Sequence, residues 1–512
     1  MMAQSPALPE APAGGSTDFA GPCPAAEVEE ILRRVEAEHD LLRYTVDGWC
    51  AWPLLRFGVA MELQRLPLSG GGLRRRGTLA RVAEAVRGAG PFLTVRRTPY
   101  LAKTYTSGLG ERTGGKYKDV WFDDLLLAVG EHVKLEAVNN ADFLPRRAAA
   151  LLPATLTNTP LEVLAGVLAR GLPSAEIRRV AHALADVLAA ELGTQKYDAP
   201  TVDRHLQHFA WSRSVYHRLL GRVRPTHVLT ADPGEYALVA AAKELGITSV
   251  ELQHGLLDRV SHPSYAWTAY AAPFKHRMPV PDVLFLYGDH WRDELQANGF
   301  WGDSARAVGS LRMEQYRRQR AQRRPGDAFT IVFSTQGLDV AGSIGFLRQF
   351  LTLGQQDRDL RLILKLHPVY DRDPGAYRAA LASDSRVCVL GAAEGETVFE
   401  LIARADLHLS ISSTCHYEAL GLGVPTVVLP FTTSEVMAPL CRVGHARLAS
   451  TPSELWEVVG RTRAGEAPSA PSEYYFKSGA LGNMLRELRA GRAAAAPAAP
   501  STRHENRRRI RA

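Results

Sequence analysis

The sequence Lys365-Leu-His-Pro-Val-Tyr-Asp371 decides the expected fold, together with Ser410-Ile-Ser-Ser-Thr-Cys-His-Tyr-Glu418 downstream. Each stretch follows a short apolar run that predicts a buried strand. The first carries a histidine two positions after a lysine, and the second ends in hydroxyl residues that open a helix. Ligands bind at the carboxyl ends of parallel strands in open α/β sheets, and helix N-termini receive phosphate there. The two stretches therefore indicate a site for a nucleotide phosphate ester.

Strands and helices alternate around these stretches. Strands are predicted at 330–334, 361–366, 387–390, 407–411 and 426–429, and helices at 344–355, 374–382, 396–404, 414–421 and 452–463. Upstream, the pattern predicts strands at 226–230, 248–252 and 283–287 and a helix at 236–245. Strands separated by helices of this length indicate parallel sheets of right-handed βαβ units. We therefore expect an α/β protein with two halves, 28–280 and 281–490.

The remaining segments are less regular. We expect a disordered leader at 1–27, helices within 28–66, a helical insert at about 147–222, and a disordered basic tail at 491–512. A strand is predicted at 91–95. The Gly- and Thr-rich segment 103–116 is predicted to be a long polar loop, which is often functional in a compact domain. The basic segment 317–324 is predicted to be a linker.

Composition excludes several protein classes. The chain has 512 residues, of which 46% are hydrophobic and 22% charged, as in ordinary globular proteins. It contains no apolar run of the roughly 18 residues that a membrane helix needs, and its first residues lack the features of a secretion signal. Its five cysteines form no Cys-x-x-Cys pair, so we expect a reducing cytoplasm and no metal site. Cys388 is predicted to be a core residue.

The formal charge of +7 is concentrated partly in two basic clusters, 74–76 and 503–511. Such clusters are usually solvated, but they also suit an anionic membrane surface or a polyanionic glycan. Nucleic acid is not an expected partner, because no stacking-aromatic or recognition-helix motif accompanies the charge.

Residues around the two leading stretches are candidates for binding a donor nucleotide. Lys365 and His367 lie on one side of a strand end, where a cation and an imidazole would stabilise a leaving phosphate. Alternatively, the histidine belongs to a plain turn. Three hydroxyls before a helix are further candidates, although helix capping alone explains one of them. A carboxylate one turn later, a Gly-containing strand-end loop, and an arginine that points into a cleft or to the surface complete the group. These are Ser412, Ser413, Thr414, Glu418, Ser334, Thr335, Gln336, Gly337 and Arg312.

A second group of candidates suits a general base. His254 in Gln253-His-Gly255 ends a predicted strand, and its glycine neighbour leaves room for a substrate. Asp232 and Glu235 end the neighbouring strand and are rival bases. Alternatively, His254 is a loop histidine whose hydrogen bonds are made within the protein. Asp232 and Glu235 alternatively belong to an Asp-Pro-Gly turn and complement a helix N-terminus.

Gln253-His-Gly255, Lys365-Leu-His-Pro368 and Ser412-Ser-Thr414 with Glu418 resemble the GT-B glycosyltransferases of bacterial surface polysaccharide assembly. The nearest in pattern are capsule transferases of the Kdo and sialic-acid type and CDP-glycerol glycerophosphotransferases. The resemblance covers about 226–465. The sequence departs from these family patterns in two places. The paired acids of the sialyltransferase pattern are interrupted here, as Asp232-Pro-Gly-Glu235, and Glu251-Leu-Gln253 replaces the longer stretch that precedes the His-Gly of the glycerophosphotransferases.

This resemblance implies two Rossmann-like domains that face a central cleft. The first would bind a glycan or lipid-linked acceptor, and the second a nucleotide-activated sugar or polyol donor. It implies no metal or other cofactor, and a cytoplasmic location, peripheral at the inner face of the plasma membrane. The alternatives are a nucleotide-sugar 2-epimerase of the same fold and a non-catalytic subunit of polysaccharide assembly.

Overall fold

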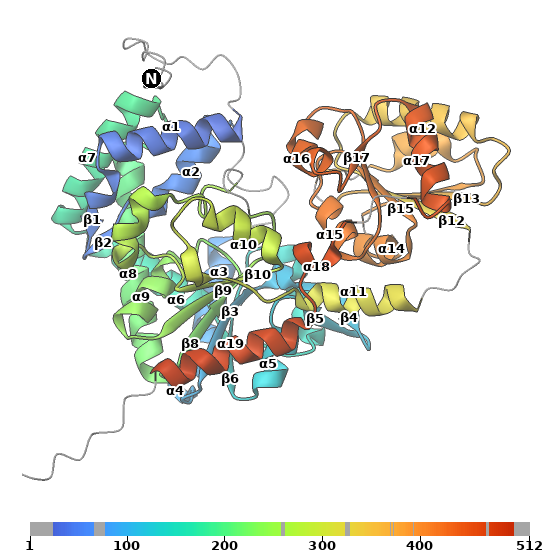
Figure 1. The fold of residues 1–512 in the computed structure, drawn as a ribbon. Coiled ribbons are helices and arrows are strands. Elements are labelled where there is room, and N and C mark those ends of the chain that lie inside the picture. Colours follow the sequence, from blue (N-terminus) through green and yellow to red (C-terminus); the bar gives the residue numbers. More distant parts are fainter. Residues whose placement is uncertain are drawn as a thin grey trace, which may run out of the picture.

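A computed structural model of the chain describes residues 24–65, 77–257, 262–322, 328–368, 370–371, 373–392, 394–466 and 470–495. They form two α/β domains that lie side by side (Figure 1). The predicted leader up to residue 23, the cluster 74–76 and the tail beyond 495 lie outside the described residues.

The first domain is built on a seven-stranded parallel sheet. Its order is β11 (Ala305–Ala307), β10 (Val283–Leu286), β9 (Thr248–Leu252), β8 (His227–Thr230), β3 (Tyr100–Tyr105), β6 (His132–Ala137) and β7 (Leu156–Thr157). Alternate side chains of a strand face opposite sides of the sheet. Leu101 and Val228 pack on the side of α8 and α9, and Ala102 and Leu229 on the side of α5 and α19.

The second domain is built on a six-stranded parallel sheet. Its order is β14 (Val387–Leu390), β13 (Leu360–Lys365), β12 (Phe329–Ser334), β15 (Leu407–Ser410), β16 (Thr426–Val428) and β17 (Arg447–Leu448). Helices α12, α13 and α17 cover one face of this sheet, and α14 and α15 pack on the other. Both sheets therefore have the layered organisation that the alternation of strands and helices predicts.

Helices make up most of the remaining structure. The α-helices are α1 (Ala25–Glu38), α2 (Pro53–Leu63), α3 (Thr78–Gly88), α4 (Pro91–Thr94), α5 (Asp123–Val129), α6 (Thr159–Gly171), α7 (Ala175–Leu192), α8 (Ala199–Val223), α9 (Tyr236–Glu244), α10 (Asp289–Gln296), α11 (Leu311–Ala321), α12 (Val340–Leu353), α13 (Gly375–Leu381), α14 (Val398–Arg404), α15 (Cys415–Gly421), α16 (Ala438–Arg442), α17 (Pro452–Arg463), α18 (Ser472–Tyr475) and α19 (Ala480–Ala495). Short 3-10 helices are η1 (Leu41–Arg43), η2 (Thr106–Gly108), η3 (Ala141–Ala149), η4 (Ala269–Arg277), η5 (Gly302–Ser304) and η6 (Ser434–Met437). No helix in the described ranges is both long and apolar enough to cross a bilayer.

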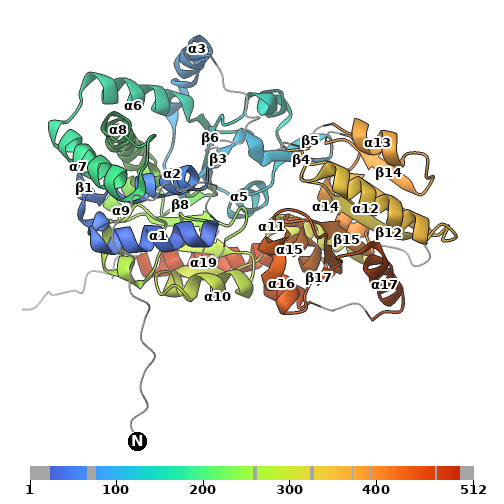
Figure 2. The same ribbon diagram turned by 90° about the horizontal axis from the view of Figure 1, so that it is seen from above.

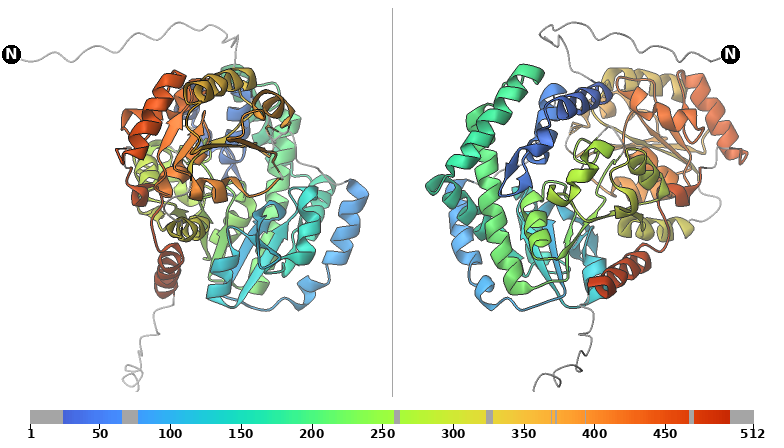
Figure 3. Two further views of the ribbon diagram at one scale, coloured as in Figure 1. Left: turned by 90° about the vertical axis from the view of Figure 1, so that its right-hand side faces the viewer. Right: turned by 60° about the vertical axis from the view of Figure 1, so that its left-hand side comes forward.

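Several of the additional helices of the first half pack together and share one core. Figure 2 shows α1, α2, α7 and α8 together, and Figure 3 gives the same group from other sides. Asp198 caps α8 by accepting a hydrogen bond from the Thr201 amide, which explains where this helix begins. The expected α/β class and the expected helices of the first half are confirmed.

The predicted boundary between residues 280 and 281 is wrong. β10 and β11 follow it in sequence but pair with the first sheet, so that sheet extends to Ala307. The chain also returns at its end, because Met484 and Leu488 of α19 pack on the first domain (Figure 1). The predicted linker 317–324 is helical in α11 as far as Ala321.

Several local predictions are also corrected. Residues 91–95 contain the short helix α4, and the predicted loop 103–116 contains the end of β3 and part of the hairpin β4 (Leu109–Thr113) and β5 (Lys116–Asp119). A second hairpin joins β1 (Thr45–Val46) to β2 (Trp49–Cys50). The ends of the predicted leader and tail are helical, at Ala25 in α1 and up to Ala495 in α19. Cys388 is exposed, because β14 is an edge strand.

A buried arginine fixes the first two helices. Arg56 of α2 is 1% exposed and binds Glu29 and Glu36 of α1, each at 2.6 Å. Removing one partner of a buried ion pair leaves uncompensated charge. We predict that Arg56→Met lowers the free energy of unfolding by about 3–5 kcal/mol in urea denaturation.

The matched control is Arg43→Met, because Arg43 is 72% exposed and lies 3.5 Å from Asp40. It should change the free energy of unfolding by less than about 1 kcal/mol. Equal effects of the two substitutions would show that the buried network does not hold α1.

Candidate active site between the two sheets

One cavity of about 170 Å³ lies between the two domains. The first domain contributes the ends of β9, β10 and β11 and the η2–β4 and β5–α5 connections, and the second contributes α14 and α15. Three of the predicted site residues line it, namely His254, Arg312 and Glu418. A volume of this size is below the roughly 300–1,000 Å³ of small-molecule pockets. It accommodates the reacting groups of a substrate rather than a whole nucleotide sugar.

His254 follows β9, where the chain leaves the first sheet. Burial lowers the pKa of its imidazole, and the negative charge of Asp232 opposes that shift. The imidazole is therefore neutral at neutral pH. Its Nδ1 is enclosed and has no hydrogen-bond partner among the described residues. His262 lies beside it, with ring centroids 6.4 Å apart. A neutral imidazole in a cleft is able to accept a proton from a substrate.

Arg312 links the two domains at the start of α11. Its Nε lies 2.6 Å from Glu111 Oε1 in the β4–β5 hairpin, and its guanidinium lies 3.7 Å from the ring centroid of Phe399 in α14. The Tyr316 hydroxyl donates to the same Glu111 oxygen at 2.6 Å. Arg312 thus faces the cavity, as one of its two predicted orientations requires, but an acid already balances its charge.

Glu418 enters the cavity from α15. Burial raises the pKa of its carboxyl to about 7, while the charge of Arg312 acts in the opposite direction. One carboxylate oxygen is enclosed without a hydrogen-bond partner in the described part of the chain. Cys415 lies one turn earlier, where burial raises the pKa of its thiol and the charge of Glu418 acts in the same direction.

The strand-end loop after β12 packs against its neighbours. Ser334 Oγ lies 2.9 Å from His408 Nε2, and Thr335 donates to Asp371 at 2.5 Å. Gly337 has a φ of +69°, and a side chain there would collide with the Tyr370 carbonyl. The loop therefore holds the His-Pro turn in place, and its glycine is required for that close approach.

The hydroxyl cluster lies at the adjacent strand end. Gln336 accepts a hydrogen bond from the Ser412 amide at 2.8 Å, and Ser412 Oγ lies 2.7 Å from Thr433 Oγ1. Ser413 Oγ accepts from the Cys415 amide at 3.2 Å. Thr414 precedes α15 but makes no capping hydrogen bond with its side chain. Capping of α15 therefore accounts for one of the three hydroxyls, that of Ser413, and not for those of Ser412 and Thr414.

Lys365 and His367 lie at this edge, but their contacts differ from expectation. The Lys365 ammonium donates to the carbonyls of Gly391 and Glu394 at 3.0 and 2.7 Å. These contacts fix the loop after β14 and do not support the predicted phosphate role. Burial lowers the pKa of His367, which favours a neutral imidazole rather than the expected protonated one. Its Nδ1 accepts from the Tyr370 amide at 3.1 Å.

The rival acids are not equivalent to His254. Asp232 accepts from the Gly234 amide at 2.6 Å, which is the turn expected for Asp-Pro-Gly. Glu235 is buried and binds Lys103 and the Tyr105 hydroxyl. It faces a second, larger cavity instead of the one between the domains. An ion-paired carboxylate with two donors is a weak base candidate.

Sequence reasoning missed the partners of Glu235. Burial acts to lower the pKa of Lys103, but the charges and hydrogen bonds of Glu235 and Tyr216 together outweigh burial and raise it. Lys103 also donates to Tyr216 at 2.8 Å. The signal available was a lysine inside the short apolar run Tyr100-Leu-Ala-Lys103. Glu251 was missed likewise, although a charged residue in the strand Thr248–Leu252 indicates a special environment.

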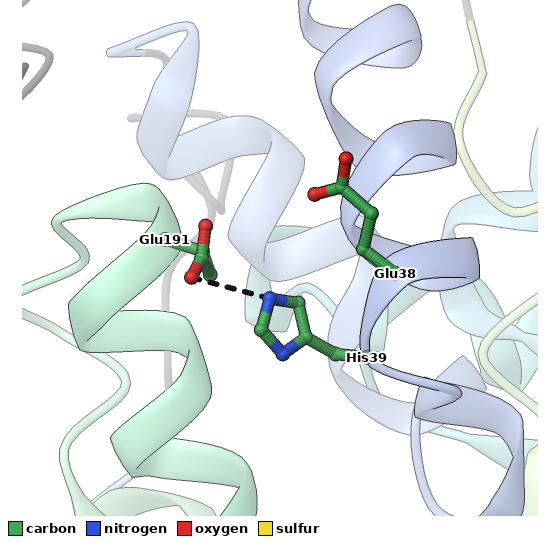
Figure 4. Close-up of side chains that lie close together, drawn as sticks. All are labelled: Glu38, His39 and Glu191. Atoms are coloured by element: carbon green, nitrogen blue, oxygen red, sulfur yellow. Dashed lines mark ion pairs between the residues drawn. The ribbon is translucent and has the colours of Figure 1, made fainter. Parts of the chain in front are cut away.

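One group of three potential metal ligands occurs among the described residues, Glu38, His39 and Glu191 (Figure 4). Their ligand atoms lie within 4.8 Å of one another. His39 Nε2 and Glu191 Oε1 are 3.2 Å apart, so an ion pair between the end of α1 and α7 accounts for part of the cluster. None of the three lines either cavity.

No protein-family model matches the sequence, and no curated protein matches it significantly. Among solved structures, the chain is similar to UDP-GlcNAc 2-epimerase from Neisseria meningitidis bound to UDP-GlcNAc, at 14% identity and a TM-score of 0.49, over 76% of this chain and 99% of that one. It is similar to MurG from Acinetobacter baumannii at 11% identity and a TM-score of 0.44, over 76% and 99%. The wall teichoic acid polymerase TagF gives 10% identity and a TM-score of 0.42, over 82% and 97%.

Likenesses at these identities and TM-scores assign no activity to this chain. The GT-B class of fold is instead evident in the molecule itself, which has two parallel sheets with flanking helices and one cavity between them.

The raised pKa of Glu251 can be tested through the pH dependence of stability, and Glu251 lies on β9, the strand that leads to His254. Burial raises the pKa of its carboxyl from an ordinary 4.5 to about 8, against a hydrogen bond from Tyr265. Between these values the folded protein keeps a proton that the unfolded chain has released, so stability should fall as pH rises. We predict that Glu251→Gln flattens the decline of the melting temperature between pH 5 and pH 8.

Glu457→Gln is the control, because Glu457 is exposed on α17. It should keep the wild-type slope. An unchanged slope for Glu251→Gln would mean that Glu251 does not hold its proton in the folded state.

Proposed function

We propose that this protein transfers a sugar or polyol-phosphate group from a nucleotide-activated donor to a saccharide acceptor. The observation that carries this proposal is the inter-domain cavity, which is lined by His254 from the first domain, Glu418 from the second, and Arg312 from the helix between them. A two-substrate transfer needs groups from an acceptor side and a donor side to meet at one point.

His254 acts as the general base. Its neutral imidazole takes the proton of the acceptor hydroxyl while the hydroxyl oxygen attacks the donor. The bond to the nucleotide phosphate breaks, and the phosphate leaves with the bonding electrons. The negative charge of Asp232 opposes the lowering of the His254 pKa by burial, and it therefore favours the imidazolium that forms. Glu235 has no role as a base, because Lys103 and Tyr105 bind it.

The carboxyl edge of the second sheet binds the donor. The hydroxyls of Ser412, Ser413 and Thr414 and the imidazole of His367 donate hydrogen bonds to its phosphate oxygens. Glu418 binds a ribose or sugar hydroxyl, which a carboxyl with a pKa of about 7 does in either protonation state. Arg312 lines the same cavity, where its charge acts on Glu418 as well as on its ion-pair partner Glu111.

The motif resemblance supports two further proposals. The donor is of the kind used by capsule transferases of the Kdo and sialic-acid type or by CDP-glycerol glycerophosphotransferases, and the product is a bacterial surface polysaccharide. The reaction takes place in the cytoplasm, at the inner face of the plasma membrane.

We predict that His254→Ala lowers transfer by roughly 100-fold or more, because a general base contributes about that factor. Binding of the free nucleotide product should stay near wild type. The assay is a panel of CMP-, CDP-, UDP- and GDP-linked donors with and without saccharide acceptors, with calorimetry for the nucleotides. Wild-type transfer should also persist below pH 6.5, since burial lowers the pKa of this histidine.

His276→Ala is the control, because His276 is exposed on η4. Full transfer by the His254→Ala protein would remove the base assignment. An epimerised donor without any transfer product in the wild-type assay would favour the 2-epimerase alternative.

The hydroxyl cluster gives a separate prediction. Changing both Ser412 and Ser413 to alanine should weaken binding of the nucleotide product by roughly tenfold or more, because hydrogen bonds to a charged phosphate are lost. Ser383→Ala, at an exposed position after α13, should leave affinity unchanged. If the double variant binds normally, the two serines only shape the loop before α15.

A further inference from the structure

A second cavity, larger than the one between the domains, lies within the first domain and has a volume of about 640 Å³. Its walls come from α2, α3, α6, α8 and the start of α9, and the end of β3 lies at its floor. This volume lies inside the roughly 300–1,000 Å³ range of small-molecule sites. It is therefore large enough for a ligand that the cavity between the domains cannot hold.

One stripe of α8 faces this cavity. Arg204, His208, Ser212 and Tyr216 recur at four-residue spacing and line it, together with His205, Phe209 and Val215. Residues four apart lie on one face of a helix. Val202 and Leu206, on another face of α8, are buried in the core that α8 shares with α1, α2 and α7. Helix α8 therefore presents polar side chains to this cavity as well as to bulk solvent.

A chain of hydrogen bonds forms the floor. Lys103 donates to Tyr216 at 2.8 Å, Tyr216 donates to Asn158 Oδ1 at 2.9 Å, and Asn158 Nδ2 donates to Glu162 at 2.8 Å. Glu235 closes the chain at its other end by binding Lys103. Lys103, Tyr216, Asn158 and Glu235 are buried, and their mutual hydrogen bonds make the floor of the cavity polar and fixed in position.

Among the charged side chains that line the cavity, one cation has no ion-pair partner in the described part of the chain. Lys103 is paired with Glu235, and Arg81 lies 3.3 Å from Glu162. Arg204 donates to the Thr201 hydroxyl at 2.9 Å and has no ion pair within the described ranges. It is exposed at the cavity wall. A guanidinium binds carboxylate and phosphate groups well, because its donors form a planar fork.

The cavity lies beside the turn that carries Asp232. Gly234 and Glu235 line it and belong to the same turn as Asp232, whose charge acts on His254. Apolar lining from Leu54, Leu161 and Tyr236 suits the C–H face of a sugar ring. The cavity therefore belongs to the same domain as the proposed base and suits a saccharide.

We propose that this cavity binds the acceptor, and that the acceptor is a saccharide bearing a carboxylate or phosphate group that pairs with Arg204. This inference rests on the proposed transfer function. It adds the chemical class of the acceptor and the helix that recognises it.

The test measures saccharide binding without requiring turnover. Ligand-observed NMR with glucose, glucuronate and glucose 6-phosphate compares one sugar scaffold as neutral, carboxylate and phosphate forms. At least one anionic form should bind the wild-type protein more tightly than glucose, and the form that binds better identifies the acidic group. Arg204→Gln should remove that preference, weakening the anionic sugar by roughly tenfold.

Arg218→Gln is the matched control, since Arg218 is exposed on the same helix and does not line the cavity. It should bind all three sugars as the wild type does. The inference is overturned if anionic sugars bind no better than glucose, or if Arg204→Gln and Arg218→Gln behave alike. Calorimetry with CMP, CDP, UDP and GDP on the same proteins separates the two proposals. Sugar binding without nucleotide binding contradicts the transfer function, and nucleotide binding without sugar binding contradicts the acceptor cavity.

Discussion

The buried ion pair between Lys103 and Glu235 organises the first domain. It joins β3, an interior strand that pairs with both β6 and β8, to the turn that begins α9. Through Tyr216 and Asn158 the same hydrogen-bond chain reaches α8 and the start of α6. Burying a charge without a partner is costly, so each member fixes the position of the next. The pair thereby sets the floor of the large cavity and removes Glu235 from base catalysis.

This constraint separates the tasks along the carboxyl edge of the first sheet. β3 and β8 lead into the large cavity. Its floor is polar, and Arg204 on its wall has no ion pair among the described residues. β9, β10 and β11 lead into the small cavity, where His254 meets Glu418 and Arg312. Asp232 lies between the two groups and acts electrostatically on both His254 and Glu235. The proposed recognition and the proposed chemistry thus occupy neighbouring strand ends, as expected for an α/β sheet.

The second domain was predictable almost strand by strand, whereas in the first only β8, β9 and β10 were predicted. In the second domain, apolar runs such as Leu360–Lys365 alternate regularly with helices, and local periodicity identifies both. β3 escaped prediction because its sequence Tyr100–Tyr105 contains a lysine that becomes acceptable inside a sheet only with Glu235 opposite. The boundary at 280 failed because β10 and β11 complete the first sheet by pairing, which composition does not reveal.

The sequence by itself determined the α/β class and the placement of His254, His367 and the Ser412–Thr414 hydroxyls at strand ends. Those features depend on patterns within about ten residues, which local physics encodes. Only the tertiary structure decided which candidates remain available to a ligand. Lys365 is occupied by carbonyls 26 and 29 residues away, and Glu235 by a lysine 132 residues away. Such contacts follow from how the chain returns on itself, because a side chain's freedom depends on neighbours distant in sequence.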